Sequence, residues 1–273
     1  MAALRQDPGR RFGQRLRGAA RSALAAALAA SAFGAVAAAA AGAQALTAEP
    51  IKPGLYRIQG ADGAALLRLD GTGIILVDAH RAGTYRPLMA EVQRIAKAPG
   101  AKVGAVALTA AGPQEAGNVP QFVEGGVPVI VQQQAAAKLA ADAKAQGAAG
   151  PLVTYGTDYL LRVGGLEAEV EHVGKGRTGV DSVVWFRDLR AVAVGGLYTA
   201  GTPEPDCASG GSLAGWAAAI THLLWFDFDV AVPTRGAPVG KPELLALKSK
   251  LEAMAARAAA SPQAQAGCSA PPG

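Results

Sequence analysis

Histidine and cysteine are scarce in this chain of 273 residues, which has three residues of the first type and two of the second. The histidines are His80, His172 and His222, and the cysteines are Cys207 and Cys268. These two residue types supply most ligands of zinc sites, so few such ligands are available. The two cysteines allow at most one disulfide, and two unrelated thiols are the alternative because spacing alone does not establish connectivity.

An excess of charge of one sign is also absent from most of the chain. From residue 46 onward 20 basic residues balance 20 acidic ones, so the net charge of +5 comes from residues 1–45, with six arginines and one aspartate. A neutral body does not present the basic surface that binds nucleic acid. We therefore expect no nucleic-acid partner.

The arginine-rich start leads into an alanine-rich apolar stretch that ends in the small-residue pattern Ala43-Gln44-Ala45. This arrangement predicts a signal peptide over residues 1–45, although an uncleaved membrane anchor is the alternative. Arg10-Arg11-Phe12 is close to a twin-arginine export signal. We expect a periplasmic or secreted protein that is not bound to the membrane after cleavage, in a compartment where Cys207 and Cys268 can pair.

The body, residues 46–258, has the pattern of a single α+β domain, and residues 259–273 have that of an unstructured tail. Short strand-like runs, the first of them separated by glycine and aspartate turns, predict strands, the first three consecutive and antiparallel: 54–60, 64–70, 73–79, 102–109, 127–132, 159–163, 166–173, 181–188, 190–197 and 229–234. Apolar residues at helical spacing predict helices: 84–98, 135–146, 212–226 with Ser212 as its cap, and 242–259. Two strand-rich halves, each followed by helices, indicate helices packed on sheets.

Several phrases occur in an order that resembles the metallo-β-lactamase fold superfamily, from about Ile51 to Leu251. They are GLYRIQGADGAALLRLDGTGIILVDAH, TAAGPQEAG, HVGKGRTGVDSVVWF, AVAVGGL, SGGSLAGWAAAITHLL and VPTRG. The resemblance implies an αββα four-layer sandwich. It also implies that Asp78 braces the loop that follows Thr109, and Asp181 is assigned a structural role as well.

The metal ligands of that superfamily are replaced in this chain. The likeness places Ala110 and Gly112 at the first two histidines of the metal loop, Gln114 at its aspartate and Glu115 at its third histidine. Further along the chain, the remaining ligand positions hold Arg177, Gly196 and Arg235. Alanine and glycine have no donor atom, and arginine stays protonated and repels cations. We therefore expect no metal and no cofactor.

The replacements suggest a different use for the same cavity. Arg177 and Arg235 are expected to supply positive charge where metal is bound in relatives, with Glu115 as a bidentate partner. A closed salt-bridge network that only fills the space is the structural alternative. Two arginines facing one glutamate leave positive charge for an anion, so we expect a pseudoenzyme that binds a small anion or a periplasmic protein partner.

A zinc-dependent hydrolase of an ester, thioester or amide bond is the alternative function. It requires non-standard ligands, for which His80, His172 and Glu115 are the candidates. His80 and His172 lie on predicted loops at the rim of the site and are also candidate ligand-binding residues, together with Gln114. His222 lies in a predicted helix with an ordinary amphipathic pattern.

Overall fold

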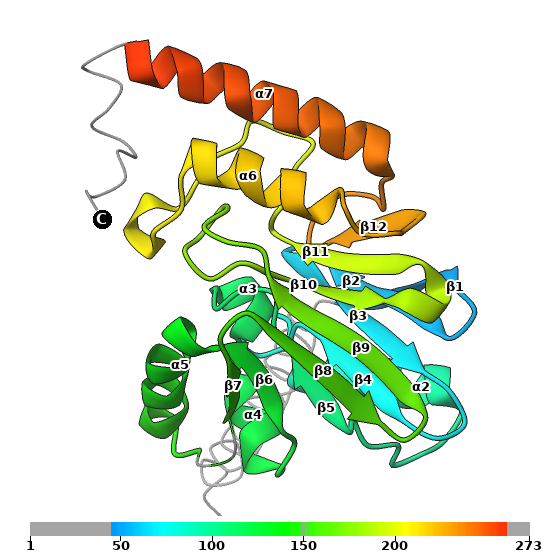
Figure 1. Cartoon of the computed structure of the whole chain (residues 1–273). Helices are drawn as coiled ribbons and strands as arrows, with labels where there is room; N and C mark the ends of the chain where they lie inside the picture. The colour runs from blue at the N-terminus through cyan, green and yellow to red at the C-terminus, as the bar shows by residue number, and fades with distance from the viewer. Residues whose placement is uncertain (1–44, 149, 151, 261–273) are drawn as a thin grey trace, which may run out of the picture. The chain divides into compact units, whose positions relative to one another are not determined.

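The computed structural model describes residues 45–148, 150 and 152–260, which form two β-sheets and their covering helices (Figure 1). The predicted signal peptide, apart from its last residue Ala45, and Cys268 lie outside the described residues. Within the described part of the chain, no helix combines the length and apolar character needed to cross a bilayer.

The first sheet has seven strands in sequence order. They are β1 (Thr47–Lys52), β2 (Leu55–Gly60), β3 (Gly63–Leu69), β4 (Ile74–Val77), β5 (Ala105–Ala107), β6 (Val129–Gln132) and β7 (Leu152–Tyr155). Strands β1 to β4 pair antiparallel, as expected from their short turns, whereas β4 to β7 pair parallel through helical crossovers. The carboxyl ends of β4 and β5 therefore meet at one edge.

The second sheet has five strands in the order β12-β11-β10-β9-β8. Its strands are β8 (Asp158–Val163), β9 (Leu166–His172), β10 (Ser182–Phe186), β11 (Ala191–Gly195) and β12 (Val230–Pro233). Strands β8 to β11 are antiparallel, and β12 joins β11 in parallel after a helical crossover.

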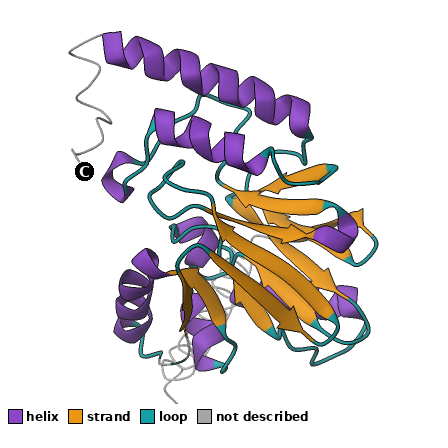
Figure 2. Ribbon diagram, in the orientation of Figure 1, coloured by secondary structure: helices purple, strands orange, loops and turns teal. Residues whose placement is uncertain are grey.

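Helices cover the outer face of each sheet (Figure 2). The first sheet is covered by α2 (Tyr85–Ala96), α4 (Val119–Glu124) and α5 (Gln133–Ala145), and the second by α6 (Leu213–Leu223) and α7 (Lys241–Ala260). Shorter elements are α3 (Pro113–Ala116), η2 (Arg187–Leu189) and η3 (Cys207–Ser209). The predicted αββα sandwich is confirmed.

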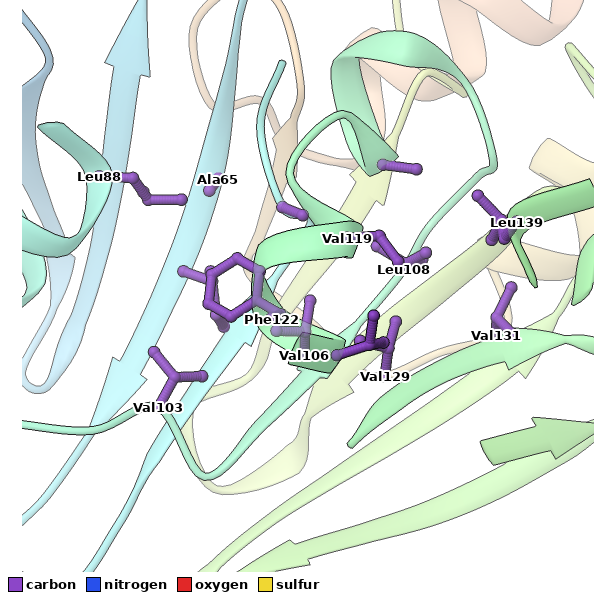
Figure 3. Close-up of a cluster of buried hydrophobic side chains, with 14 of the residues drawn as sticks. Ala65, Leu88, Val103, Val106, Leu108, Val119, Phe122, Val129, Val131 and Leu139 are labelled. Atoms are coloured by element: carbon purple, nitrogen blue, oxygen red, sulfur yellow. The ribbon is translucent and has the colours of Figure 1, made fainter. Parts of the chain in front are cut away.

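Three apolar clusters correspond to the three interfaces between these four layers. In the first, Phe122 of α4 and Leu88 of α2 pack against strands that carry Ala65, Val106 and Val129 (Figure 3). The second cluster fills the space between the sheets and the third lies under α6 and α7. Burial of these side chains is the main stabilising contribution to the layered fold.

The local signals explain most of the element boundaries. The Ser212 side chain accepts a hydrogen bond from the Gly215 amide and caps α6, as predicted. β1, β7, α3 and α4 were not predicted, because β7 has only four residues and the other three contain proline. α7 continues to Ala260, two residues beyond the predicted end of the domain at 258.

Candidate functional site

The predicted site residues gather at the edge where β4, β5, β11 and β12 end. A pocket of about 240 Å³ lies there. Glu115 and Gln114 come from α3, Arg177 from the loop between β9 and β10, and Arg235 from the loop after β12, and all four line the pocket. We call it the Glu115 pocket.

Asp78 joins the end of β4 to the start of the loop that carries α3. Its carboxylate accepts hydrogen bonds from the Thr109 amide at 2.8 Å and from the Thr109 hydroxyl at 2.8 and 3.0 Å. The Thr109 carbonyl accepts from the Ser182 amide at 2.8 Å, which ties the first sheet to β10. Burial and the neighbouring Glu115 raise the pKa of Asp78 well above its ordinary value, against the effect of the Thr109 bonds. These hydrogen bonds join Asp78 to the start of the loop that carries α3.

Glu115 is a buried acid on the floor of the pocket, with 2% of its surface exposed. The one-turn helix α3 begins at Pro113, which suits a first helical position, and the Glu115 carbonyl accepts from the Ala79 amide. A Cβ atom at Gly112 would lie 2.5 Å from Glu115 Oε2, so the carboxylate fills the space that a side chain at 112 would need. Burial raises the pKa of Glu115, while Arg177 and Arg235 act to lower it.

The loop that carries Arg177 is held by hydrogen bonds to Asp181 within the loop and to the backbone of the segment that follows β11. Asp181 accepts from the Thr178 amide at 2.6 Å and from the Thr178 hydroxyl at 2.8 Å. The Arg177 carbonyl accepts from the Asp206 amide at 2.7 Å. Burial raises the pKa of Asp181 to about 6, against those hydrogen bonds and the charge of Arg177. Asp181 therefore fixes the backbone next to Arg177 through Thr178.

Arg177 lies directly over Gly196. A Cβ atom at Gly196 would lie 3.1 Å from Arg177 Cδ and 3.4 Å from its Nη1. The glycine and the arginine are complementary, because any larger side chain at 196 would displace the guanidinium from the pocket wall. The substitutions at these two ligand positions thus fit one another sterically.

The predicted bidentate pairing of Glu115 is not found. None of the ion pairs within 4.0 Å among the described residues includes Glu115, Arg177 or Arg235. Arg235 is exposed, and its Nη2 donates a long hydrogen bond of 3.5 Å to the Asp62 carbonyl. The reason is placement: Glu115 packs against Gly112, whereas Arg177 packs against Gly196. The closed network considered from the sequence is therefore also not found among the described residues.

The histidines do not join the pocket. His80 is 1% exposed, and its Nε2 donates to the Gly63 carbonyl at 3.1 Å while Nδ1 lies 3.1 Å from Thr84 Oγ1. His172 donates from Nδ1 to the Asp181 carbonyl at 2.8 Å. His222 of α6 lies 2.7 Å from Glu171. His80 and His172 are thus engaged in holding backbone and are not among the residues that line the Glu115 pocket.

The donor set in the described part of the chain does not fit the zinc site of the superfamily. No three side chains of the His, Cys, Asp or Glu types come together there in a way that would hold a metal ion. The carboxylates of Asp78 and Asp181 each accept hydrogen bonds from a threonine. Glu115 is then the remaining acid, and the positive side chains of Arg177 and Arg235 act on it. A cationic pocket wall opposes cation binding.

The pocket contains further groups that sequence patterns did not identify. Trp216 of α6 forms part of the wall, 1% exposed, and donates from Nε1 to the Leu197 carbonyl at 2.8 Å. Tyr198, Thr199 and Thr202 add hydroxyls to the lining. Nothing in the spacing of a strand or helix shows that such residues share one pocket with α3. Cys207 is the first residue of η3 and is disulfide-bonded. Its pairing with Cys268 stays a prediction.

Comparison with known proteins supports the fold from structure alone. No family model and none of the curated proteins compared matches this sequence. Among solved structures, a metallo-β-lactamase from Pontibacter korlensis is similar with a TM-score of 0.63 and 21% identity, covering 76% of this chain and 99% of that one. The DIM-1 metallo-β-lactamase has a TM-score of 0.63 and 16% identity, covering 77% and 98%.

The FIM-1 enzyme from Pseudomonas aeruginosa, solved in a mono-zinc form, gives the same TM-score with 17% identity over 77% of this chain and 96% of its own. These identities are too low to transfer activity, since one fold carries many functions. The four layers, the strand order and these likenesses agree, so the chain has the metallo-β-lactamase fold.

Proposed function

We propose that this chain is a non-catalytic protein of the metallo-β-lactamase fold that binds a small anion in the Glu115 pocket. The observation that carries the proposal is the position of Arg177, whose guanidinium lies over Gly196 at the pocket wall without an acid within ion-pair distance among the described residues. Guanidinium donors bind carboxylates and other oxyanions through short, charge-assisted hydrogen bonds. Export from the cell, as expected from residues 1–45, is part of the same proposal.

Charge in the pocket supports an anion. Because burial raises the pKa of Glu115, this carboxyl is less able to neutralise the two arginines than an exposed acid would be. The remaining acid at the pocket, Glu204, is exposed, so its charge is screened by solvent. Arg177 and Arg235 therefore leave a positive balance beside a partly enclosed space.

The size of the pocket limits the ligand. A volume of about 240 Å³ lies below the range of roughly 300–1,000 Å³ typical of drug-sized ligands. Acetate, succinate and sulfate are suitable probes because they differ in shape and charge but share the oxyanion. Hydroxyls from Thr199, Thr202 and Tyr198 are available to orient the part of the ligand that faces away from the arginines.

Calorimetric titration with sulfate at low ionic strength tests the proposal. Arg177→Gln is expected to weaken binding in this pocket by roughly tenfold or more, the effect of losing one hydrogen bond to a charged group. Arg162→Gln is the matched control, because Arg162 is exposed, paired with Glu167 and distant from the pocket lining. Equal affinity in both variants would refute the proposal.

Elemental analysis of the purified protein tests the alternative hydrolase. Stoichiometric zinc that survives dialysis and disappears with Glu115→Ala would contradict the proposal and favour a metal-dependent enzyme. Absence of bound zinc after zinc addition, in protein that binds sulfate, agrees with an anion-binding protein. Measuring both on the same preparation separates loss of metal from loss of fold.

A further inference from the structure

A second charged feature lies at the end of the sandwich, on β2. Side chains alternate between faces along a strand, and Leu55 packs between the sheets while Ile58 packs against the helix layer. Arg57 therefore lies on the same face of β2 as Leu55, with Leu66 opposite it on β3 and Glu49 opposite it on β1. It is 6% exposed. A buried arginine in a sheet interior is an unusual and informative position.

The protein neutralises Arg57 only in part. Its Nη1 donates to Gln59 Oε1 at 2.6 Å, and the nearest acid, Glu49, is 3.7 Å away with 46% of its side chain exposed. Arg57 Nε is buried without a hydrogen-bond partner. Burial lowers the pKa of Arg57, against the charge of Glu49, but a guanidinium remains protonated in proteins. A buried charge with an incomplete set of partners is costly, and a counter-ion would lower that cost.

Arg57 lines a cavity of about 640 Å³, larger than the Glu115 pocket. β1, β2, the turn at residues 60–63 and the loop after β12 form its walls, and we call it the Arg57 cleft. Its volume is within the range of small-molecule sites. Arg235 lies on the wall between the two spaces, because it lines both.

The charges around the cleft leave a positive balance. Asp62 also lines it, but the Asp62 carboxylate pairs with Arg81 at 3.1 Å. Glu49 is then the remaining acid of a lining that also holds Arg57 and Arg235, and its ion pair is with Arg57. Two guanidinium groups at separate points of one cleft favour a ligand with two acidic groups.

We propose that the Arg57 cleft is a second anion site, which takes a small organic diacid. One carboxylate pairs with Arg57 between the sheets, the body of the ligand fills the cleft, and the second acidic group lies beside Arg235. Glu49 competes with the ligand for Arg57, and its exposure allows it to turn away into solvent. The site does not depend on Glu115 or Arg177.

Succinate titrations of four proteins test this site separately from the Glu115 pocket. The wild type is expected to show two binding components. Arg57→Gln should weaken one of them roughly ten- to hundredfold, as expected for a hydrogen-bonded charged contact, and Arg177→Gln should weaken the other. Glu49→Gln should tighten the Arg57 component about threefold or more by removing the competing carboxylate.

The outcomes separate the two proposals. If Arg177→Gln removes all succinate binding, or if Arg57→Gln leaves both components unchanged, the Arg57 cleft is not an anion site although the proposed function stands. If Arg57→Gln alone removes binding, the cleft stands and the proposed function fails. Should Arg57→Gln not fold, as judged by circular dichroism, Glu49→Gln decides, since tighter binding supports the site and unchanged or weaker binding overturns it.

Discussion

The Glu115 pocket and the Arg57 cleft share Arg235 but bury charges of opposite sign. In the pocket a 2% exposed carboxyl lies beneath arginines that are more accessible. In the cleft a 6% exposed guanidinium lies beneath Glu49, whose side chain is half exposed. A buried carboxyl can lose its charge by taking up a proton, whereas a buried guanidinium cannot.

This difference predicts how each site responds to its surroundings. The Glu115 pocket can become more positive as pH falls, because its buried group titrates. The Arg57 cleft keeps its charge across the physiological range and relies on Glu49 or a ligand as its counter-ion. Buried charge of either sign costs stability, but only one of the two sites can reduce that cost through protonation.

The largest expected effect is on stability as a function of pH. Asp181 has a folded pKa of about 6 against an ordinary 3.8, so the folded state holds its proton more tightly than the unfolded state. Protonated Asp181 therefore contributes about 3 kcal/mol to the free energy of unfolding. This contribution is fully present below pH 3.8 and is lost as pH rises through 6. Urea unfolding followed by tryptophan fluorescence between pH 4 and pH 8 measures it.

Asp181→Asn should remove about that much of the pH dependence, whatever its effect on absolute stability. Asp142→Asn, at an exposed position on α5 paired with Lys138, is the control and should keep the wild-type profile. An Asp181→Asn profile parallel to the wild type would show that the acid is not perturbed.

Removing the buried charge of the Glu115 pocket should tighten anion binding. Glu115→Gln eliminates a carboxylate beside the proposed ligand, and we expect about tenfold higher sulfate affinity at pH 8. Glu204→Gln, at an exposed position in the same pocket, should change the affinity by less than about twofold because solvent screens its charge. Weaker sulfate binding by Glu115→Gln would contradict the expected repulsion between this carboxylate and the anion.

Lowering the pH should have a similar but smaller effect on the wild-type pocket. Glu115 faces the acids Asp78 and Asp181 and the cations Arg177 and Arg235, and burial raises its pKa. Because protonation removes a negative charge from the pocket, sulfate affinity should rise about three- to fivefold from pH 8 to pH 5. Sulfate keeps its charge over this range, so the change reports the protein.

The Arg57 cleft gives the contrasting result. Measured in Arg177→Gln, where the pocket contribution is weakened, sulfate affinity should change by less than about twofold between pH 8 and pH 6, because the buried charge of the cleft is a guanidinium, which stays protonated in proteins. A pH dependence as steep as that of the pocket would remove the distinction between the two sites.

The smallest expected effect comes from the glycine beneath Arg177. In Gly196→Ala the new Cβ would lie 3.1 Å from Arg177 Cδ, and the flexible arginine is expected to shift by a few tenths of an ångström. Sulfate affinity should fall about two- to threefold, since hydrogen-bond strength depends on placement. Gly71→Ala, where a Cβ meets no atom within 4 Å, is the control. An unchanged affinity in Gly196→Ala would show that Arg177 is free to reach the ligand from another position.

Much of the fold could be predicted from local patterns. Short strand-like runs between glycine and aspartate turns identified β2, β3 and β4, and helical spacing with Ser212 as the cap identified α6. Short elements such as α3 and β7 were not predicted, because four residues are too few to show a hydrophobic periodicity. Tertiary contacts decide their conformation. The resemblance in phrase order gave the αββα arrangement that the patterns alone left open.

The site was predicted in part. Glu115, Gln114, Arg177 and Arg235 do line one pocket. The bidentate pairing of Glu115 was wrong, and His80 was expected at the rim although it lies buried against Gly63. Residue type and order show which groups converge on one edge of a sheet, but not which neighbour each side chain packs against.

The sequence by itself determined the chemistry of the positions that the resemblance aligns with metal ligands, because alanine, glycine and arginine cannot donate a lone pair to a metal wherever they lie. Tertiary structure decided which charges are buried. Arg57 occupies an ordinary strand position in the sequence, and only the folded chain, which brings the loop after β12 to the same cleft, makes it a buried residue. Burial depends on residues more than a hundred positions away, and a charge has its electrostatic cost only after they have packed around it.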